Sequence, residues 1–377
     1  MNFEKLDAYL SQMEERGIPA CDMLVMVDGR VVYRHMEGFA DEGKTRPVSD
    51  TDTYYLYSCT KIMTCTAAAQ LLEQGKLSLD DPLEKYLPAF AGMKVAVKGE
   101  EPVPAEGPIR IRHLFCMSAG LNYWFQRPEI YEAIERGVTG TVDLCSILAQ
   151  RPLDFHPGTH YSYSLCHDVL GAVVEVVSGE RFSDYCKKHI MEPLGMTDTT
   201  FHATEDQTAR LSQAYRYNAG EFTAMAIPPF NPYEITSDYD SGGAGLCSSA
   251  ASYAKLPAAL ANGGVSANGN RILKEETVLM MTESLLTPSA LADFGKDRFA
   301  GYGFGMCGRV HMRPEVSGGL SPVGEFGWDG AAASYVMIDP INRVSAFFCT
   351  FVHGCGYGYN FVHPRLRDLV YTCLSEE

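Results

Sequence analysis

A serine and a lysine one helical turn apart are the residues of this chain whose types and spacing best fit nucleophilic catalysis. They are Ser58 and Lys61, in the segment Ser58-Cys-Thr-Lys61, which we expect at the start of a helix over 58–74. Side chains three positions apart lie on the same face of a helix, so the Lys61 amine can reach the Ser58 hydroxyl. We expect burial and the positive helix start to favour the neutral amine, which would accept the serine proton.

The spacing alone does not identify the nucleophile, because Ser252-Tyr-Ala-Lys255 has the same pattern. Ser58 lies at an expected strand-to-helix transition, directly after the aromatic run 54–57. Ser252 instead lies within an alanine-rich amphipathic stretch. We therefore interpret the second copy as an ordinary helix surface and take Ser58 as the candidate nucleophile.

A serine hydrolase with a lysine base also needs a second proton carrier and a second oxyanion donor. An aromatic turn at 155–164 offers Tyr161 as the phenol that relays the proton; the alternative is a tyrosine that only anchors the turn. The run Gly327-Trp-Asp-Gly-Ala331 enters an expected late strand, where a backbone amide could complete the oxyanion hole with that of Ser58. The alternative there is a tryptophan packed in a turn.

Other chemistries find less support in the motifs. The match to a phosphate-binding loop at 38–45 contains Asp41 and Glu42 and is followed by Pro47, so we interpret it as a surface turn. The dinucleotide-type glycine pattern at 303–308 is followed by strand-like sequence and not by a helix. The sequence holds no Gly-x-Ser-x-Gly, no His-Glu-x-x-His and no metal-ligand spacing among its ten histidines, so we expect neither a metal nor a cofactor.

A series of motifs makes the chain resemble the serine β-lactamase and D,D-peptidase (penicillin-binding protein-like) superfamily, in particular its β-lactamase-like, family VIII carboxylesterases. The resemblance spans most of the chain, and the motifs stand in the order that the family has. They are Tyr57-Ser58-Cys-Thr-Lys61, 75–82, 109–121, Pro157-Gly158 with Tyr161-Ser-Tyr163, Pro193-Leu-Gly-Met196, 242–246 and 326–330.

The resemblance implies a role for each motif residue. Ser58 would be the acylated nucleophile, Lys61 its proton partner, and Tyr161 the general base that later serves as acid. The backbone amides of Ser58 and Ala331 would hold the oxyanion.

Three further residues, Tyr163, Trp328 and Gly330, would line the substrate side of this site. Two of them depart from the superfamily pattern. Tyr163 stands where the common Tyr-x-Asn motif has its asparagine, which removes the amide expected to bind a β-lactam side chain. Trp328 replaces the cation of a Lys-x-Gly or His-x-Gly motif, which helps to hold a substrate carboxylate. With these departures, the resemblance favours a neutral or apolar substrate group.

The elements that must position these residues predict a mixed α/β (α+β) fold, and the resemblance implies the serine β-lactamase and D,D-peptidase type. Strands are expected at 23–27, 30–36, 300–311, 333–338 and 343–352. Helices are expected at 3–16, 58–74, 109–118, 143–150, 165–178, 181–192, 248–262, 273–285 and 363–374. Strands at both ends predict an antiparallel sheet domain formed by 1–78 and 203–377, with an inserted, mainly helical domain at 79–202.

Composition and charge exclude several classes of protein. Hydrophobic residues make up 46% of the 377 residues and charged residues 21%, as in ordinary folded proteins. The 31 basic and 47 acidic residues give a net charge of −16, which disfavours binding to nucleic acid. We find neither a secretory signal nor a bilayer-spanning apolar stretch, and twelve scattered cysteines fit a reducing compartment. We therefore expect a cytoplasmic protein without membrane insertion.

Together these observations predict a serine hydrolase that acts on a small-molecule ester or amide. The favoured hypothesis is an esterase for neutral carboxylic esters that forms an acyl-enzyme on Ser58. An amide hydrolase of the β-lactamase or D,D-peptidase type, or an acyltransferase, is the first alternative. A non-catalytic scaffold with the same fold is the second. The sequence leaves the physiological substrate, the acyl-chain preference and the oligomeric state open.

Overall fold

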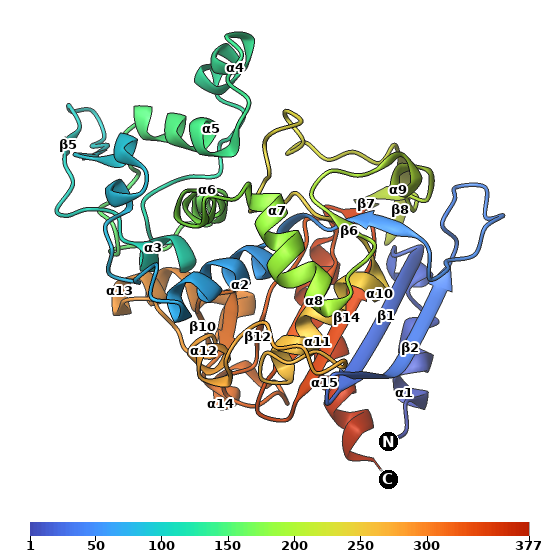
Figure 1. Cartoon of the computed structure of the whole chain (residues 1–377). Helices are drawn as coiled ribbons and strands as arrows, with labels where there is room; N and C mark the ends of the chain where they lie inside the picture. Colours follow the sequence, from blue (N-terminus) through green and yellow to red (C-terminus); the bar gives the residue numbers. More distant parts are fainter. Residues whose placement is uncertain (377) are drawn as a thin grey trace.

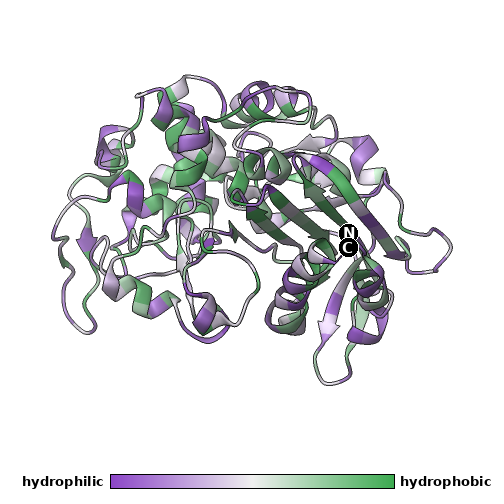
Figure 2. Cartoon of the chain, turned by 90° about the horizontal axis from the view of Figure 1, so that it is seen from below, coloured by the Kyte–Doolittle hydropathy of each residue, from purple (hydrophilic) through white to green (hydrophobic). Residues whose placement is uncertain are grey.

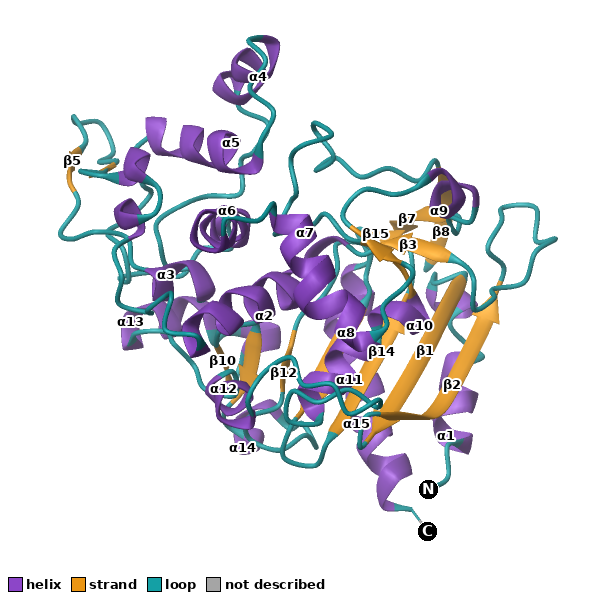
Figure 3. Cartoon of the chain, in the orientation of Figure 1, coloured by secondary structure: helices purple, strands orange, loops and turns teal. Residues whose placement is uncertain are grey.

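A seven-stranded antiparallel sheet forms the centre of the computed structural model, which describes residues 1–376 (Figures 1 and 3). In sheet order its strands are β10 (Tyr302–Phe304), β11 (Arg309–His311), β12 (Phe326–Gly327), β13 (Tyr335–Asp339), β14 (Val344–Cys349), β1 (Ala20–Val27) and β2 (Arg30–Gly38). The first strand of the chain pairs with β14, so the sheet joins the two ends of the sequence. The predicted antiparallel sheet with flanking helices is therefore confirmed.

The first two strands form the hairpin that the sequence predicts. They pair antiparallel along their length and are joined by Asp28 and Gly29, whose φ angles are 50° and 74°. Positive φ at both positions is what a two-residue hairpin turn requires. Along β1 the side chains alternate, so that Met23 and Val25 belong to one apolar cluster and Leu24, between them, belongs to the other. The central strands β1, β13 and β14 are thus buried on both faces, whereas the edge strand β2 is partly exposed. Figure 2 shows the apolar character of the central strands.

Helices cover both faces of this sheet (Figure 1). The α-helices of the described residues, including those that lie away from the sheet, are α1 (Glu4–Leu10), α2 (Thr60–Glu73), α3 (Ile111–Phe115), α4 (Pro128–Glu135), α5 (Thr141–Ile147), α6 (Cys166–Ser178), α7 (Phe182–Cys186), α8 (Glu192–Leu194), α9 (Glu205–Ala209), α10 (Ala250–Tyr253), α11 (Lys255–Ala261), α12 (Glu275–Met280), α13 (Pro288–Phe294), α14 (Pro314–Ser317) and α15 (His363–Ser375). The first and last helices pack together on one face, and α11 contacts β13 and β14 on the other. None of the helices within 1–376 combines the length and apolar character needed to cross a bilayer.

Shorter elements connect these layers. Three small sheets contain β15 (Val352–His353), β7 (Ala214–Asn218) and β8 (Thr223–Ile227); β3 (Thr53–Tyr55), β9 (Cys247–Ser249) and β6 (Thr199–Thr200); and β4 (Lys94–Val95) with β5 (Val103–Pro104). Short 3-10 or π turns are η1 (Glu14–Arg16), η2 (Tyr57–Cys59), η3 (Leu83–Lys85), η4 (Pro88–Phe90), η5 (Leu148–Gln150), η6 (Lys187–Met191), η7 (Asp297–Phe299) and η8 (Gly358–Val362).

Helix α2 is the element that brings the candidate site into the interior. Every residue from Thr60 to Leu71 is buried, and the helix packs against α6, α7 and η6. Helices α3 to α6 lie beyond it, away from the main sheet (Figure 3). The sequence missed α4 (Pro128–Glu135), a short surface helix. The boundaries of the inserted domain, 79–202, stay a prediction.

Candidate active site

Ser58 lies in η2, the turn that leads from β3 into α2. The residue before it, Tyr57, has a φ of 46°, a left-handed conformation that is strained for a bulky side chain. A hydrogen bond from its phenol to the Phe230 carbonyl (2.5 Å) and nearly complete burial hold it there. The Tyr253 hydroxyl donates to the Cys59 carbonyl at 2.7 Å. These contacts fix the serine at the strand-to-helix transition that the sequence predicts.

Lys61 lies on the first turn of α2 and is fully buried. Its Nζ donates to Ser58 Oγ at 3.2 Å and to the Gly243 carbonyl at 2.8 Å. Both partners are uncharged. The rings of Tyr163 and Tyr123 lie 4.8 and 5.5 Å from the same nitrogen. The structure therefore brings Lys61 and Ser58 together as their spacing predicts.

The phenol that reaches Ser58 belongs to Tyr163. Its hydroxyl donates to Ser58 Oγ at 2.7 Å and accepts a hydrogen bond from Trp328 Nε1 at 3.1 Å. Its ring stacks between those of Tyr123 and Trp328, with centroid distances of 5.1 and 5.4 Å. Two residues that sequence analysis gave to the substrate wall thus form a hydrogen-bonded chain that ends at the serine.

Tyr161 does not take the position that sequence analysis gave it. Its ring packs against Phe294 and Phe304, with centroids 4.9 and 5.4 Å away. Within the described chain, no hydrogen bond joins its phenol to Ser58 or Lys61. Burial raises the pKa of Tyr161 well above the usual range, so the phenol keeps its proton. This residue borders the cavity but does not fit the role of a general base.

Two tyrosines separated by one residue explain the misassignment. Residues 161–165 belong to no helix or strand, so no periodicity indicates which phenol faces Ser58. Tyr163 stands three residues before Cys166, where α6 begins, but this spacing by itself does not distinguish the two tyrosines. If the Tyr-x-Asn motif is placed on Tyr163, the fully buried Leu165 stands where the motif has asparagine. The asparagine amide is therefore absent with either tyrosine.

Ser58 borders a cavity of about 380 Å³ with a mainly aromatic wall. The lining residues are Ser58, Tyr123, Tyr161, Tyr163, Tyr233, Arg298, Phe299, Trp328, Asp329, Gly330, Ala331 and Tyr359. The two charged members, Arg298 and Asp329, form an ion pair of 2.8 Å, so their charges cancel. Burial raises the pKa of Asp329, but Arg298, His363 and Arg309 outweigh burial and hold that pKa well below its usual range.

Sequence reasoning missed Arg298, Phe299 and Tyr359 as members of this wall. The first two lie in η7 and the third in η8, short turns far from the quoted motifs. Only the tertiary fold brings them to the cavity, and no local pattern marks them.

Ala331 lies on the turn between β12 and β13 and borders the same cavity. Its N–H has no hydrogen-bond acceptor within residues 1–376, whereas Ala333 N–H donates to the Gly330 carbonyl at 3.0 Å. A Cβ at Gly330 would lie 2.7 Å from the Leu56 carbonyl, so glycine lets the turn pack against the segment before Ser58. A free amide beside a nucleophile is what an oxyanion hole needs.

The glycine turn at 242–246 supports Lys61 from the other side. Besides accepting the Lys61 hydrogen bond, Gly243 packs closely against a buried carboxylate, because a Cβ there would lie 2.3 Å from Asp168 Oδ2. Asp168 in turn accepts hydrogen bonds from Tyr239 (2.9 Å) and Ser241 (2.7 Å). Sequence analysis quoted this turn in the resemblance without giving it a role.

Other groups of the chain do not form a comparable site. The second Ser-x-x-Lys is taken up in structural contacts: Ser252 Oγ lies 2.8 Å from Thr199 Oγ1, and Lys255 bonds to the Gly195 carbonyl. Within residues 1–376, no cluster of three or more His, Cys, Asp or Glu side chains is arranged to hold a metal ion.

Comparison with known proteins decides the family. A model of the beta-lactamase family matches residues 6–351. The chain belongs to the beta-lactamase family. It is 28% identical over 375 residues to Esterase EstB of Burkholderia gladioli, covering 92% of this chain and 89% of that one. It is 30% identical over 276 residues to the lovastatin esterase of Penicillium rubens, covering 70% and 68%. The structure of EstCE1, described as a hydrolase with promiscuous acyltransferase activity, matches with a TM-score of 0.79, 27% identity and 98% coverage of both chains.

Membership of the beta-lactamase family confirms the resemblance that the motifs indicate. With the esterase names of its relatives, it identifies this chain as a serine hydrolase. Within this beta-lactamase-family enzyme the site differs from expectation in one respect, because Tyr163 stands beside Ser58 in place of Tyr161.

Proposed function

We propose that this beta-lactamase-family protein is an esterase that hydrolyses small, neutral carboxylic esters through an acyl-enzyme on Ser58. The observation that carries the proposal is the pair of contacts at one hydroxyl: Lys61 Nζ lies 3.2 Å and the Tyr163 hydroxyl 2.7 Å from Ser58 Oγ. A nucleophile held between two proton carriers beside a cavity is the arrangement that covalent catalysis needs. The esterase names of two relatives support the proposal.

In the first half-reaction, Ser58 Oγ attacks the ester carbonyl carbon while Lys61, in its uncharged form, takes the serine proton. The carbonyl oxygen becomes an oxyanion, which the amides of Ser58 and Ala331 stabilise. When the bond to the alcohol breaks, the Tyr163 phenol gives its proton to the leaving oxygen, and the Lys61 ammonium returns a proton to Tyr163. Meanwhile the Trp328 N–H stabilises negative charge on the Tyr163 oxygen.

In the second half-reaction, water takes the place of the alcohol. Its oxygen attacks the acyl carbon, its proton passes to Tyr163, and the phenol proton passes to Lys61. When the bond from the acyl carbon to Ser58 Oγ breaks, the Lys61 ammonium returns the proton to the serine. The products are a carboxylic acid and the restored enzyme, so that protons balance over the cycle.

A neutral substrate fits the cavity because its two charged wall residues neutralise each other. Arg298 is held by Asp329, and the position of the superfamily cation is taken by Trp328. Penicillins and peptidoglycan stem peptides present a carboxylate, which needs a cation free to bind it. The charge of the wall therefore supports esters over these substrates.

A second candidate activity is acyl transfer to an alcohol, which the likeness to EstCE1 favours. An alcohol would attack the acyl-enzyme in place of water, with the same proton path. Turnover of p-nitrophenyl butyrate in the presence of 1-butanol tests this candidate. Accumulation of butyl butyrate supports transfer, and formation of butyric acid alone contradicts it.

A substrate panel with the purified protein tests the main proposal. The panel contains p-nitrophenyl esters of short and long acids together with the β-lactam nitrocefin, and Ser58→Ala is the control. We expect kcat/KM for a short ester to exceed that for nitrocefin by about 100-fold or more and to be lost in Ser58→Ala. Comparable nitrocefin turnover would support the amide hydrolase instead, and no turnover of any ester would support the non-catalytic scaffold.

A further inference from the structure

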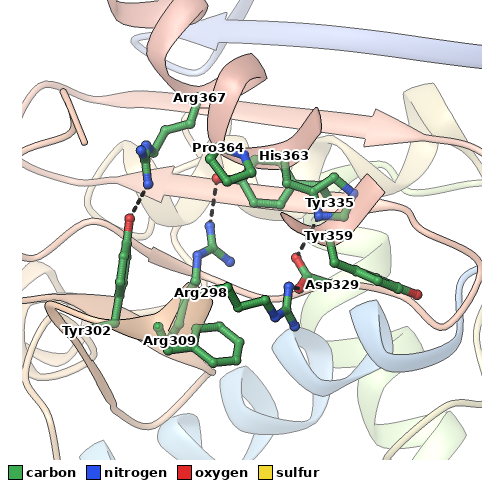
Figure 4. Close-up of a pocket in the computed structure, with 10 residues that line it drawn as sticks. Arg298, Tyr302, Arg309, Asp329, Tyr335, Tyr359, His363, Pro364 and Arg367 are labelled. Atoms are coloured by element: carbon green, nitrogen blue, oxygen red, sulfur yellow. Dashed lines mark hydrogen bonds and ion pairs between the residues drawn. The ribbon is translucent and has the colours of Figure 1, made fainter. Parts of the chain in front are cut away.

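Behind the turn that carries Ala331 lies a small polar chamber of about 30 Å³ (Figure 4). It shares Arg298, Phe299, Asp329 and Tyr359 with the wall of the substrate cavity, and His363 also lines it. Its volume suits about one or two water molecules, too little for a substrate. We therefore consider the residues that line the chamber as contacts of the turn and not as a binding site.

His363, the first residue of α15, contacts both ends of this turn and is 2% exposed. Its Nε2 lies 2.9 Å from the Ala333 carbonyl, which can only accept, so Nε2 carries a proton. Its Nδ1 lies 3.3 Å from Asp329 Oδ1. Figure 4 shows the imidazole and the carboxylate facing one another.

At this distance the two groups are close enough for an electrostatic contact, but neither His363 Nδ1 nor Asp329 Oδ1 has a hydrogen-bond partner within residues 1–376. The other charges around the chamber are paired: Arg298 binds Asp329 at 2.8 Å, Arg309 binds Glu325 at 3.0 Å, and Arg367 binds Asp368 at 2.9 Å.

Tyr359 adds a third contact one helical turn before His363. Its hydroxyl donates to the Gly330 carbonyl at 2.9 Å. The turn is thus held at three of its residues, on both sides of Ala331. One of the three, Ala333, has a φ of 63°, a left-handed conformation that a non-glycine residue keeps only where its surroundings impose it.

We propose that His363 is a positioning residue for the oxyanion hole: it holds the turn 329–333 from behind, so that the Ala331 amide faces the carbonyl oxygen of an ester at Ser58. The inference rests on the proposed function and adds a residue that does not touch the substrate. Loss of one oxyanion donor lowers kcat by about 100- to 1000-fold. A turn that is loosened but present should therefore lower kcat by about 10- to 100-fold, with little change in KM, because the donor acts mainly in the transition state.

Three variants test the proposal. His363→Leu removes both contacts of the ring, and His363→Gln keeps an amide donor for the Ala333 carbonyl. Tyr302→Phe is the matched control, because Tyr302 lines the same chamber and bonds to Arg367 but does not contact the turn (Figure 4). For each variant, kcat and KM for p-nitrophenyl butyrate are measured together with thermal unfolding.

We expect kcat to fall about 10- to 100-fold in His363→Leu and to recover partly in His363→Gln, to about 3- to 10-fold below the unmodified enzyme, with KM within about threefold throughout. Tyr302→Phe should keep the original kcat. An unchanged kcat in His363→Leu, a change confined to KM, or an equal loss in Tyr302→Phe would overturn the proposal.

Two further outcomes remain decisive. If His363→Leu does not fold, His363→Gln is compared with Tyr302→Phe: a kcat about 3- to 10-fold below that of the control supports the positioning role, and an equal kcat refutes it. An unmodified protein without ester turnover would refute the proposed function and this inference with it. An active protein whose kcat is insensitive to His363 would refute only the inference.

Discussion

At the scale of single residues, three hydrogen bonds join Trp328, Tyr163, Ser58 and Lys61 into one chain through the site. The serine oxygen stands in the middle, between an amine and a phenol. Because the rings of Tyr163 and Trp328 also stack, the phenol has little freedom to leave its hydrogen bonds. This arrangement makes the roles of individual atoms testable by small substitutions.

The two neighbouring tyrosines offer a matched pair of variants. Tyr163→Phe removes the hydroxyl that contacts Ser58, so we expect kcat/KM for a p-nitrophenyl ester to fall by about 100- to 10,000-fold, the usual contribution of a general acid or base. Tyr161→Phe removes a hydroxyl without such a contact and should stay within about threefold of the original value. Steady-state kinetics of both variants show which tyrosine takes part in catalysis. A larger loss of kcat/KM in Tyr161→Phe than in Tyr163→Phe would restore Tyr161 to the role that sequence analysis gave it.

Trp328 should contribute through its indole N–H. Trp328→Phe keeps an aromatic ring but removes the donor to the Tyr163 oxygen. Since a hydrogen bond to a charged group contributes about 1.5–3 kcal/mol, we expect kcat to fall by about 10- to 100-fold. KM for a neutral ester should change little. A rise in KM at constant kcat would instead show that Trp328 only binds substrate.

The sequence predicted the contact between Ser58 and Lys61, because a single helix sets its geometry. It did not predict which tyrosine contacts Ser58, because that segment is not helical. Ser58 and Lys61 share one helical turn, so their spacing fixes their contact. Residues 161–165 are irregular, and there the packing of Tyr161 among Phe294 and Phe304 decides which phenol remains for the serine. Such packing depends on segments more than a hundred residues away.

At the scale of elements, the site depends on turns that pack closely against the start of α2. Glycine at 330 lets the turn that carries Ala331 meet the Leu56 carbonyl, and Gly243 lets a second turn fit between Lys61 and Asp168. The sequence marked both turns as motifs, because glycine-rich runs are easily recognised. Their partners could not be predicted, since local patterns say nothing of which distant backbone they approach.

A single methyl group tests the close approach at Gly243. In Gly243→Ala the new Cβ would lie 2.3 Å from Asp168 Oδ2 and 3.3 Å from Lys61 Nζ, so the turn or the lysine must move. We expect a loss of stability of about 1–3 kcal/mol and at least a tenfold lower kcat/KM, about the cost of an overpacked core. Thermal unfolding and ester kinetics measure both effects.

The control for this change is Gly107→Ala. Gly107 has no positive φ, and no heavy atom lies within 4 Å of the place that its Cβ would take, so a methyl group should alter stability by less than about 0.5 kcal/mol. Equal behaviour of the two variants would contradict the close packing between the 242–246 turn and Lys61.

At the scale of the whole molecule, the two ends of the chain complete one sheet, and the site lies between this layer and the helices around α2. The sequence indicated this organisation, because strand patterns occur at both ends and helical patterns between them. Much of the cavity wall could not be indicated in the same way, since Tyr233, Arg298 and Tyr359 come from three separate segments. Only the assembled fold places them together.

Buried histidines predict how the stability of the molecule depends on pH. His167 is fully buried with Nε2 2.9 Å from the Phe115 carbonyl; burial, and then repulsion from Lys61, lowers its pKa to about 3. In the unfolded chain a histidine has a pKa of about 6.5, so the unfolded state binds more protons between these values. This contribution is complete above about pH 6.5 and is lost as the pH falls, by about 2 kcal/mol at pH 5.

Thermal unfolding between pH 7.5 and 5 checks this prediction. The melting temperature should fall with pH, and it should fall less steeply in His167→Gln, which has no proton to take up at this position. The comparison uses the slope and not the absolute stability, because the substitution itself alters the core. Parallel slopes for the two proteins would contradict the contribution assigned to His167.

The central claim is that Ser58 carries the acyl group, and mass spectrometry of the reacting enzyme tests it most directly. The protein is mixed with an excess of p-nitrophenyl butyrate, quenched in acid within the first turnovers, digested and mapped. We predict one butyryl group on the peptide that contains Ser58, increased in amount when Tyr163→Phe slows its removal more than its formation, and absent in Ser58→Ala. Ester turnover without any adduct at Ser58, or with an adduct that persists in Ser58→Ala, would contradict the account.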